Sequence, residues 1–219
     1  MSTHVMSPVA SRPTAGSGSG SAAAAVILAA WFALVLGLAV VGAFVSPPGT
    51  APLPIAIGFA APIVIFLVGV LLWRPLREFV LATDVRLLVA IQGWRFAGLG
   101  FIALYVHGVL PGTFAWPAGL GDMAIAITAP WVLTAIARRP EFANSRAFVV
   151  WNLLGMLDLV VAVGTGALSS ALASGLPGEI TTRPMATLPL VLIPAYLVPI
   201  FMMLHVAALL QVRRSPPGK

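Results

Sequence analysis

Charged side chains are scarce in this sequence. Only 8% of its 219 residues are Asp, Glu, Lys or Arg, whereas 60% are hydrophobic. A mean hydropathy of +1.04 leaves too few polar side chains to cover the surface of a water-soluble globule of this length. The composition therefore excludes an ordinary soluble domain and indicates a protein that is embedded in a membrane.

Cysteine is absent altogether. The chain can therefore form no disulfide, bind no metal through thiolates and use no thiol nucleophile. The sequence also lacks a P-loop, a GxGxxG fingerprint and an HExxH motif. We expect no cofactor and no metal, and we favour a non-enzymatic role while leaving enzyme activity open.

Long apolar runs dominate what is present. Six of them approach the roughly 20 residues that a membrane-spanning helix needs. They predict an all-α, polytopic transmembrane helix bundle with spans at about 22–45, 53–73, 87–110, 120–137, 147–168 and 186–212.

The ends of the chain differ from these runs. A segment rich in Ser, Gly and Pro predicts a disordered cytoplasmic tail over 1–21, and 213–219 forms a second cytoplasmic tail. Cleavage of the first span as a secretory signal, near Val41-Gly42-Ala43, stays open as an alternative.

Basic residues gather on one side of the predicted bundle. Of the 12 Lys and Arg residues, Arg183 lies on one side and Arg95 lies within a span. The remaining ten lie in the tails and in the second and fourth loops. Because cytoplasmic loops are enriched in Lys and Arg, both termini are predicted to be cytoplasmic, and an even number of spans agrees with that.

The net charge of +6 raises the question of nucleic acid as a partner. The basic residues flank the spans, where they can contact anionic lipid head groups at roughly 1 kcal/mol each. We therefore expect the lipid bilayer, with anionic head groups at the cytoplasmic Arg and Lys, and no nucleic acid. A homo-oligomer is left open.

Polar side chains within the spans are the candidates for a substrate or ion pathway, because they are expensive at membrane depth. These candidates are Arg95, Asp158, Asp122, Asn152, Gln92, His107 and His205. A rise of about 1.5 Å per residue puts Arg95 and Asp158 at similar depths from the cytoplasmic side. We predict that they form an ion pair, with Asn152 and Gln92 in support. The pair can be structural or part of a pathway, and we favour the structural role.

The remaining candidate residues, Asp122, His107 and His205, each have more than one possible role. Asp122 is predicted to lie at the outer start of the fourth span, where a carboxylate caps free N–H groups. We favour this cap over an outward-facing ion or proton site that Asp122 would form with His107. Two imidazoles can hold a haem, but His107 and His205 lie near opposite ends of their spans. His205 is instead expected at a helix interface or in the layer of Arg95.

Prolines recur through the sixth predicted span. Pro194 and Pro199 are interior and are expected to kink the helix or free backbone carbonyls. Broken helices line substrate sites in some transporters, although membrane helices also tolerate proline without such a role.

Three blocks in the middle of the chain resemble a known family. They read WRF at 94–96, LPGTFAWPAGLGD at 110–122 and WNLLGMLDL at 151–159, and they contain the patterns PAGxGD and WNxxGxxD. They resemble a family of small, uncharacterised bacterial membrane proteins. The resemblance implies an integral protein of the bacterial cytoplasmic (inner) membrane. That family has no established activity, so no functional residue can be transferred.

Three hypotheses for function follow. The first is a small transporter or permease that uses the polar residues between the third, fourth and fifth spans. The second is a membrane scaffold or assembly factor without transport activity. The third is a membrane enzyme or an electron-transfer subunit.

Overall fold

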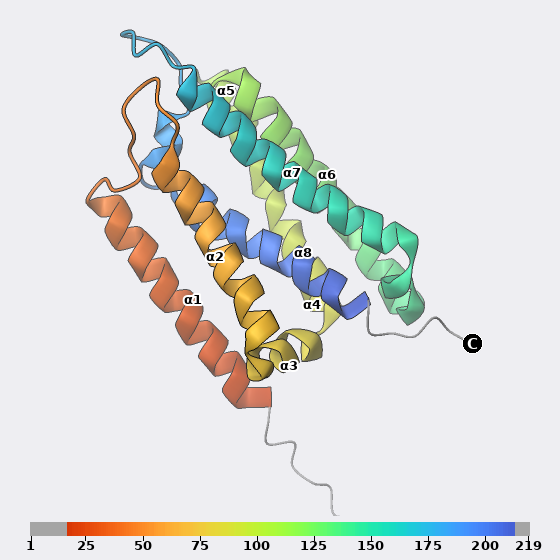
Figure 1. The fold of residues 1–219 in the computed structure, drawn as a ribbon. Coiled ribbons are helices and arrows are strands. Elements are labelled where there is room, and N and C mark those ends of the chain that lie inside the picture. Colours follow the sequence, from red (N-terminus) through yellow and green to blue (C-terminus); the bar gives the residue numbers. More distant parts are fainter. Residues whose placement is uncertain (1–16, 213–219) are drawn as a thin grey trace, which may run out of the picture.

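A computed structural model describes residues 17–212, which fold as a bundle of helices without strands in this range (Figure 1). The α-helices are α1 (Ser17–Val40), α2 (Leu53–Leu72), α3 (Arg74–Ala82), α4 (Val85–Ile91), α5 (Leu99–Val106), α6 (Gly112–Arg138), α7 (Arg146–Ala171) and α8 (Val198–Val212). The tighter or wider helical segments are η1 (Gln92–Gly98), η2 (Pro140–Asn144), η3 (Arg183–Ala186) and η4 (Ile193–Leu197).

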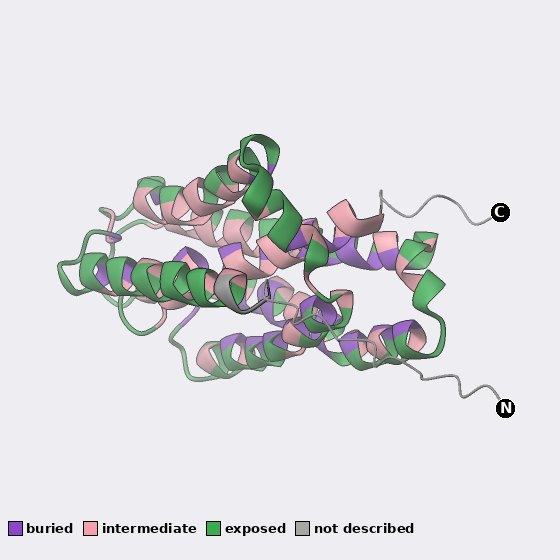
Figure 2. Ribbon diagram, turned by 90° about the horizontal axis from the view of Figure 1, so that it is seen from below, coloured by how far each residue is buried: buried purple, intermediate pink, exposed green. Residues whose placement is uncertain are grey.

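Six helical segments of the described chain are long and apolar enough to cross a membrane. They are Gly20–Val40, Leu53–Leu72, Val85–Val106, Gly112–Arg138, Arg146–Ala171 and Ile193–Val212. Large apolar side chains on α1, α2 and the outer faces of the other helices are exposed (Figure 2). This outward apolar surface is what a lipid-facing helix requires, because the bilayer solvates it. The all-helical, six-span prediction is confirmed.

Segment ends differ from the prediction at several places. The helix α1 begins at Ser17, inside the expected 1–21 tail, whereas residues 1–16 and 213–219 lie outside the described range. The largest difference is at α6, which begins at Gly112 and includes Pro117. The predicted span begins only at about residue 120, after Pro117 and Gly119, which are residues that break helices in water. Inside a bilayer the backbone must pair internally, so membrane helices tolerate both residues.

The third span is not a continuous α-helix. Its middle, Gln92–Gly98, is a 3₁₀-helix between α4 and α5. Because a 3₁₀-helix has three residues per turn, positions 92, 95 and 98 lie in line along one face. Gln92, Arg95 and Gly98 are the buried residues of this segment, whereas Trp94 is 77% exposed. The tighter turn thus presents two polar side chains and a glycine to the bundle interior.

The sixth span begins later than predicted. Residues 187–191 form turns, and the span begins at Ile193 with the wide, π-helical η4. Pro194 lies in η4 and Pro199 lies in the first turn of α8. The predicted interruption of regular α-helix at these prolines is therefore present, at the start of the span.

The first span contacts the rest of the bundle through η4. The Tyr196 hydroxyl donates to the Leu28 carbonyl oxygen over 3.0 Å. The Tyr196 ring also packs against Trp31 and Phe32, with ring centroids 4.7 and 5.3 Å away. Val35 and Ala39 of α1 are buried in a hydrophobic cluster with Val191 and Ala195, whereas the other faces of α1 are largely exposed. This span is therefore a peripheral helix that packs on the bundle along one face.

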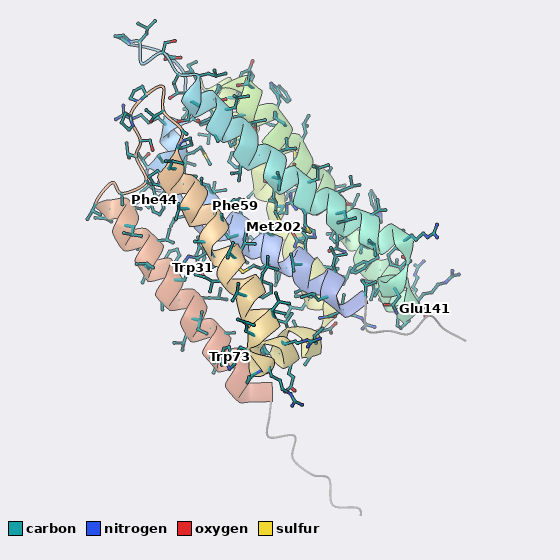
Figure 3. All side chains as sticks on the ribbon, in the orientation of Figure 1. Trp31, Phe44, Phe59, Trp73, Glu141 and Met202 are labelled. Atoms are coloured by element: carbon teal, nitrogen blue, oxygen red, sulfur yellow. The ribbon has the colours of Figure 1, made fainter. Side chains whose placement is uncertain are left out.

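The bundle has two chemically different ends. The basic end carries α3, the α6–α7 connection, the start of α1 and the end of α8 (Figure 1). The neutral end carries the connections 41–52, 107–111 and 172–192, whose charged residues are Glu179 and Arg183. Phe44 marks the neutral end, and Trp73 and Glu141 mark the basic end (Figure 3). The basic end is thus the side of the bundle that was predicted to carry most of the Lys and Arg residues.

Candidate functional site: a buried charge cluster at the floor of a cavity

Arg95 is the centre of a polar cluster in the middle of the bundle. Its side chain is fully buried, at 0% exposure. Its Nε–H donates to Asp122 Oδ1 over 2.7 Å, and its Nη2 donates to Asp158 Oδ2. Its Nη1 donates to the Gly155 carbonyl oxygen and to His205 Nε2, each over 3.2 Å. The guanidinium therefore ties η1 to α6, α7 and α8.

The predicted Arg95–Asp158 ion pair is confirmed, but it has a second acid. Asp122 and Asp158 both pair with the single guanidinium. With both carboxylates ionised, the cluster carries one positive and two negative charges. A proton or a cation is needed to bring it to neutrality, and charge at membrane depth is costly unless it is balanced.

Hydrogen bonds fix the tautomer of His205. The Asn152 side chain donates through Nδ2 to the Phe148 carbonyl oxygen over 2.9 Å, which turns its Oδ1 toward His205. His205 Nδ1 lies 2.9 Å from that oxygen and must carry the hydrogen, because Oδ1 can only accept. His205 Nε2 is then an acceptor for Arg95. His205 is therefore neutral, and the expectation that it joins the layer of Arg95 is confirmed.

Three glycines make room for the cluster. A Cβ on Gly121 would overlap the Asp158 carboxylate, one on Gly155 would overlap the His205 ring, and one on Gly98 would overlap Asp122. Small residues allow close approach of helices in membranes. Here the space that each glycine leaves is filled by a polar side chain of the cluster.

Gln92 lies one 3₁₀ turn before Arg95 and is 1% exposed. Its Nε2 donates to the Phe201 carbonyl oxygen over 3.3 Å. Its Oε1 is the single buried side-chain oxygen or nitrogen within 17–212 that has no hydrogen-bond partner. Such orphan acceptors are rare in folded proteins, so this oxygen is a place where a water molecule or a ligand donor would be stabilised.

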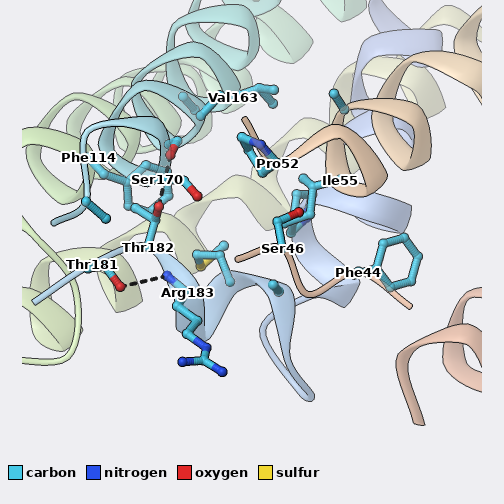
Figure 4. Close-up of a pocket in the computed structure, with 18 of the residues that line it drawn as sticks. Phe44, Ser46, Pro52, Ile55, Phe114, Val163, Ser170, Thr181, Thr182 and Arg183 are labelled. Carbon is cyan, nitrogen blue, oxygen red and sulfur yellow. Dashed lines mark hydrogen bonds between the residues drawn. The ribbon is translucent and has the colours of Figure 1, made fainter. Parts of the chain in front are cut away.

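A cavity of about 210 Å³ lies at the neutral end of the bundle (Figure 4), and its lining extends to this cluster. Its mouth is formed by the connections around Ser46, Glu179 and Arg183. Along α7 it is lined by residues that recur every three or four positions, namely Leu159, Ala162, Val163, Gly166, Ala167 and Ser170. This stripe is about 17 Å long at the rise of an α-helix. Asp122 also lines the cavity.

The cluster lies deep in the bundle. Asp122 is ten residues beyond Gly112, which is about 15 Å along α6 from the neutral end. The exposed fractions of the Asp122 and Asp158 side chains are 16% and 11%, whereas the Arg95 side chain is fully buried. The cavity therefore connects the neutral end with one acid of the cluster.

The structure corrects the role that we favoured for Asp122. The N-cap of α6 is Pro111, so Asp122 caps no helix. The prediction was wrong because it assumed that the helix begins near Leu120. The alternative site with His107 is also wrong, since His107 is the exposed C-cap of α5 at the neutral end. The two residues lie at different depths.

The structure also bears on the haem alternative. Both ring nitrogens of His205 are occupied, one by Arg95 and one by Asn152. Coordination of an iron by His205 would break one of these hydrogen bonds. Within the described range there is no group of three or more His, Asp or Glu side chains placed to hold a metal ion.

The all-helical fold and the six apolar spans define the class of the protein as an integral membrane protein of the polytopic α-helical type. The chain belongs to the family of DUF8737, a domain of unknown function, which matches residues 52–213. The match includes the five spans from α2 to α8 and leaves α1 outside. No curated protein and no solved structure matches the chain at a significant level. The matched domain has no assigned function.

Proposed function

We propose that this protein is a small membrane transporter in which the cavity is the solute path from one membrane face and the Arg95 cluster is its floor. The observation that carries the proposal is the lining of the cavity. One wall is a stripe of small side chains on α7, and the far end reaches the Asp122 carboxylate. Ligand sites are concave and mostly apolar, with a few polar groups in defined places.

The composition of the cluster supports a role beyond packing. A structural ion pair needs one acid for one guanidinium, and neutral groups suffice to satisfy the remaining N–H donors. Here Arg95 has two acids, and one of them borders the cavity. A second carboxylate adds an electrostatic cost at membrane depth, and a bound solute or proton would offset that cost.

One break in regular helix lines the path, and a second holds the cluster at its floor. The 3₁₀ segment η1 holds Arg95, and the π-helical segment η4 contributes Ile193 and Pro194 to the cavity wall. Interrupted helices at substrate depth recur in membrane transporters, because irregular backbone is tolerated where it lines a cavity. These breaks supply places where the spans can bend to open the floor toward the basic end.

The excess of arginine at the basic end supports an orientation with this end in the cytoplasm and the cavity mouth outside. Together with the resemblance of the central blocks, this favours the cytoplasmic membrane of a bacterium as the location. In that setting the cavity would take up solutes from the external face.

Transport can be tested in proteoliposomes by measuring the uptake of radiolabelled organic cations, organic anions and neutral amino acids. Ala167→Phe places a ring in the cavity, and Leu168→Phe adds a ring of the same size to a position that is 59% exposed toward lipid. We expect a response to one solute class with the wild type and Leu168→Phe, and none with Ala167→Phe. Responses equal to those of empty liposomes for all classes, or an unaffected Ala167→Phe variant, would refute transport through this cavity.

A further inference from the structure

The cavity presents one acidic oxygen at its floor. Asp122 Oδ1 accepts the Arg95 Nε–H, whereas Asp122 Oδ2 has no hydrogen-bond partner within residues 17–212. Asp122 lines the cavity and its side chain is 16% exposed, so its carboxylate offers a free acceptor in a cluster that has two carboxylates for one guanidinium. The electrostatics of the floor favour a cation and disfavour an anion.

The walls above this floor are apolar and partly aromatic. Phe101 and Phe114 line the cavity and pack edge to face, with ring centroids 5.3 Å apart. Phe44, Ile55 and Val163 line it as well (Figure 4). Aromatic faces attract organic cations, and the apolar walls favour an organic body over a hydrated inorganic ion.

The charges at the mouth do not reverse this preference. Glu179 and Arg183 both border the cavity and have opposite signs. The Glu179 carboxylate accepts the backbone N–H groups of Ser174 and Gly175 over 3.0 and 2.8 Å, which holds this acid at the mouth. The deepest charged group of the cavity is therefore Asp122, and its sign decides what is stable at the floor.

We infer that the cavity binds a monovalent organic cation with an apolar or aromatic body, whose charged group contacts Asp122. This inference rests on the proposed transport function and names its substrate class. The bound cation brings the cluster of one guanidinium and two carboxylates to neutrality, and its body replaces water along the small-residue stripe of α7. A cavity of about 210 Å³ suits a molecule of the size of a substituted benzylammonium.

Benzyltrimethylammonium is a suitable probe because its charge is permanent and its body is aromatic. Equilibrium dialysis with the purified protein in nanodiscs of zwitterionic lipid measures its binding. Phenylmethanesulfonate, which has a similar shape and the opposite charge, and neopentylbenzene, its uncharged isostere, serve as competitors. We expect saturable binding of the cation and at least tenfold weaker competition by each of the other two.

Two pairs of variants assign the binding to the cavity. Asp122→Asn should weaken binding at least tenfold, whereas Asp84→Asn removes the same charge at an exposed helix cap of the basic end and should leave binding unchanged. Ala167→Phe should abolish binding and Leu168→Phe should not. The steric pair remains decisive if Asp122→Asn does not fold.

Absence of saturable binding to the wild type, unchanged binding to Asp122→Asn, or equal competition by phenylmethanesulfonate would overturn the inference. The outcome is separable from that of the transport experiment. Uptake of an anion or a neutral solute that Ala167→Phe blocks would retain the transporter and reject the cation. Binding of the cation without any flux would retain the ligand class and reject transport.

Discussion

Gly121 on α6 faces Asp158 on α7 so closely that a Cβ at position 121 would overlap the Asp158 carboxylate. Asp158 in turn pairs with Arg95 and cannot move away without giving up that contact. The hydrogen atom of Gly121 is thus a condition for the ion pair. The absence of a side chain at Gly121 on α6 is therefore needed for the ion pair that Asp158 on α7 forms with Arg95.

Gly121→Ala is therefore expected to destabilise the protein strongly, by about 3 kcal/mol or more, since it strains or breaks a buried pair. Gly164→Ala is the matched control, because nothing lies within 4 Å of the Cβ that it adds to the same bundle. The control should be as stable as the wild type or slightly more stable, given the helix preference for Ala. Thermal unfolding in detergent gives the ranking. Equal unfolding temperatures of the two variants would contradict the close contact.

Arg95→Met should be the most damaging single change in the cluster. It leaves two carboxylates without a cation, and breaking even one buried pair typically costs about 3–5 kcal/mol. Asp122→Asn or Asp158→Asn should each cost less than about 2 kcal/mol, because the amide oxygen can still accept from Arg95 and the cluster becomes neutral.

Combining Arg95→Met with Asp122→Asn and Asp158→Asn should recover part of the stability lost by Arg95→Met alone. Unfolding temperatures of the single, double and triple variants measure this coupling. Strictly additive losses would show that the three side chains do not act together.

His205 should be neutral with its hydrogen on Nδ1, because Asn152 Oδ1 accepts from this nitrogen and Arg95 donates to the other. Nitrogen NMR of the protein labelled in the imidazole distinguishes the protonated from the unprotonated ring nitrogen. One pyrrole-like and one pyridine-like signal is expected for His205. Two protonated nitrogens would contradict the arrangement, and His205→Phe identifies the resonances.

The orientation of the bundle can be tested with single cysteines, because the sequence has none of its own. Ser174 is exposed at the neutral end and Asn144 is exposed at the basic end. An impermeant thiol reagent should modify Ser174→Cys in intact cells and Asn144→Cys only after permeabilisation. The reverse pattern would place the cavity mouth in the cytoplasm.

The ion pair between Arg95 and Asp158 could be predicted from sequence because both residues lie within long apolar runs and their distances from the span ends are similar. The place of Asp122 could not, since Gly119, Gly121 and Pro117 are turn signals in water. In a bilayer, backbone N–H and C=O groups without a partner cost more free energy than Gly or Pro within a helix does. The helix therefore continues through these residues. The available signal was that Gly121 and Asp122 are adjacent in sequence. A small residue beside an acid indicates that this helix faces a crowded polar layer.

The cavity was beyond sequence analysis for a different reason. Its wall on α7 consists mainly of Ala, Gly and Ser residues, which are as common at tight helix contacts as beside open space. The difference depends on how far α2 and η4 stand from α7, which is a property of the packed bundle. The break in the third span at Gln92–Gly98 was also missed, because a 3₁₀ segment has no distinct pattern of apolar residues.

The central claim is that Asp122 is reached from the neutral end through the cavity. The most direct test is the rate at which a small cationic methanethiosulfonate reagent modifies Asp122→Cys, compared with Leu120→Cys, which lies on the same helix and is 54% exposed toward lipid. Asp122→Cys should react from the face on which Ser174→Cys reacts, and Ala167→Phe should block the reaction, while Leu120→Cys stays unmodified. An unreactive Asp122→Cys, or one that reacts faster from the opposite face, would contradict the account.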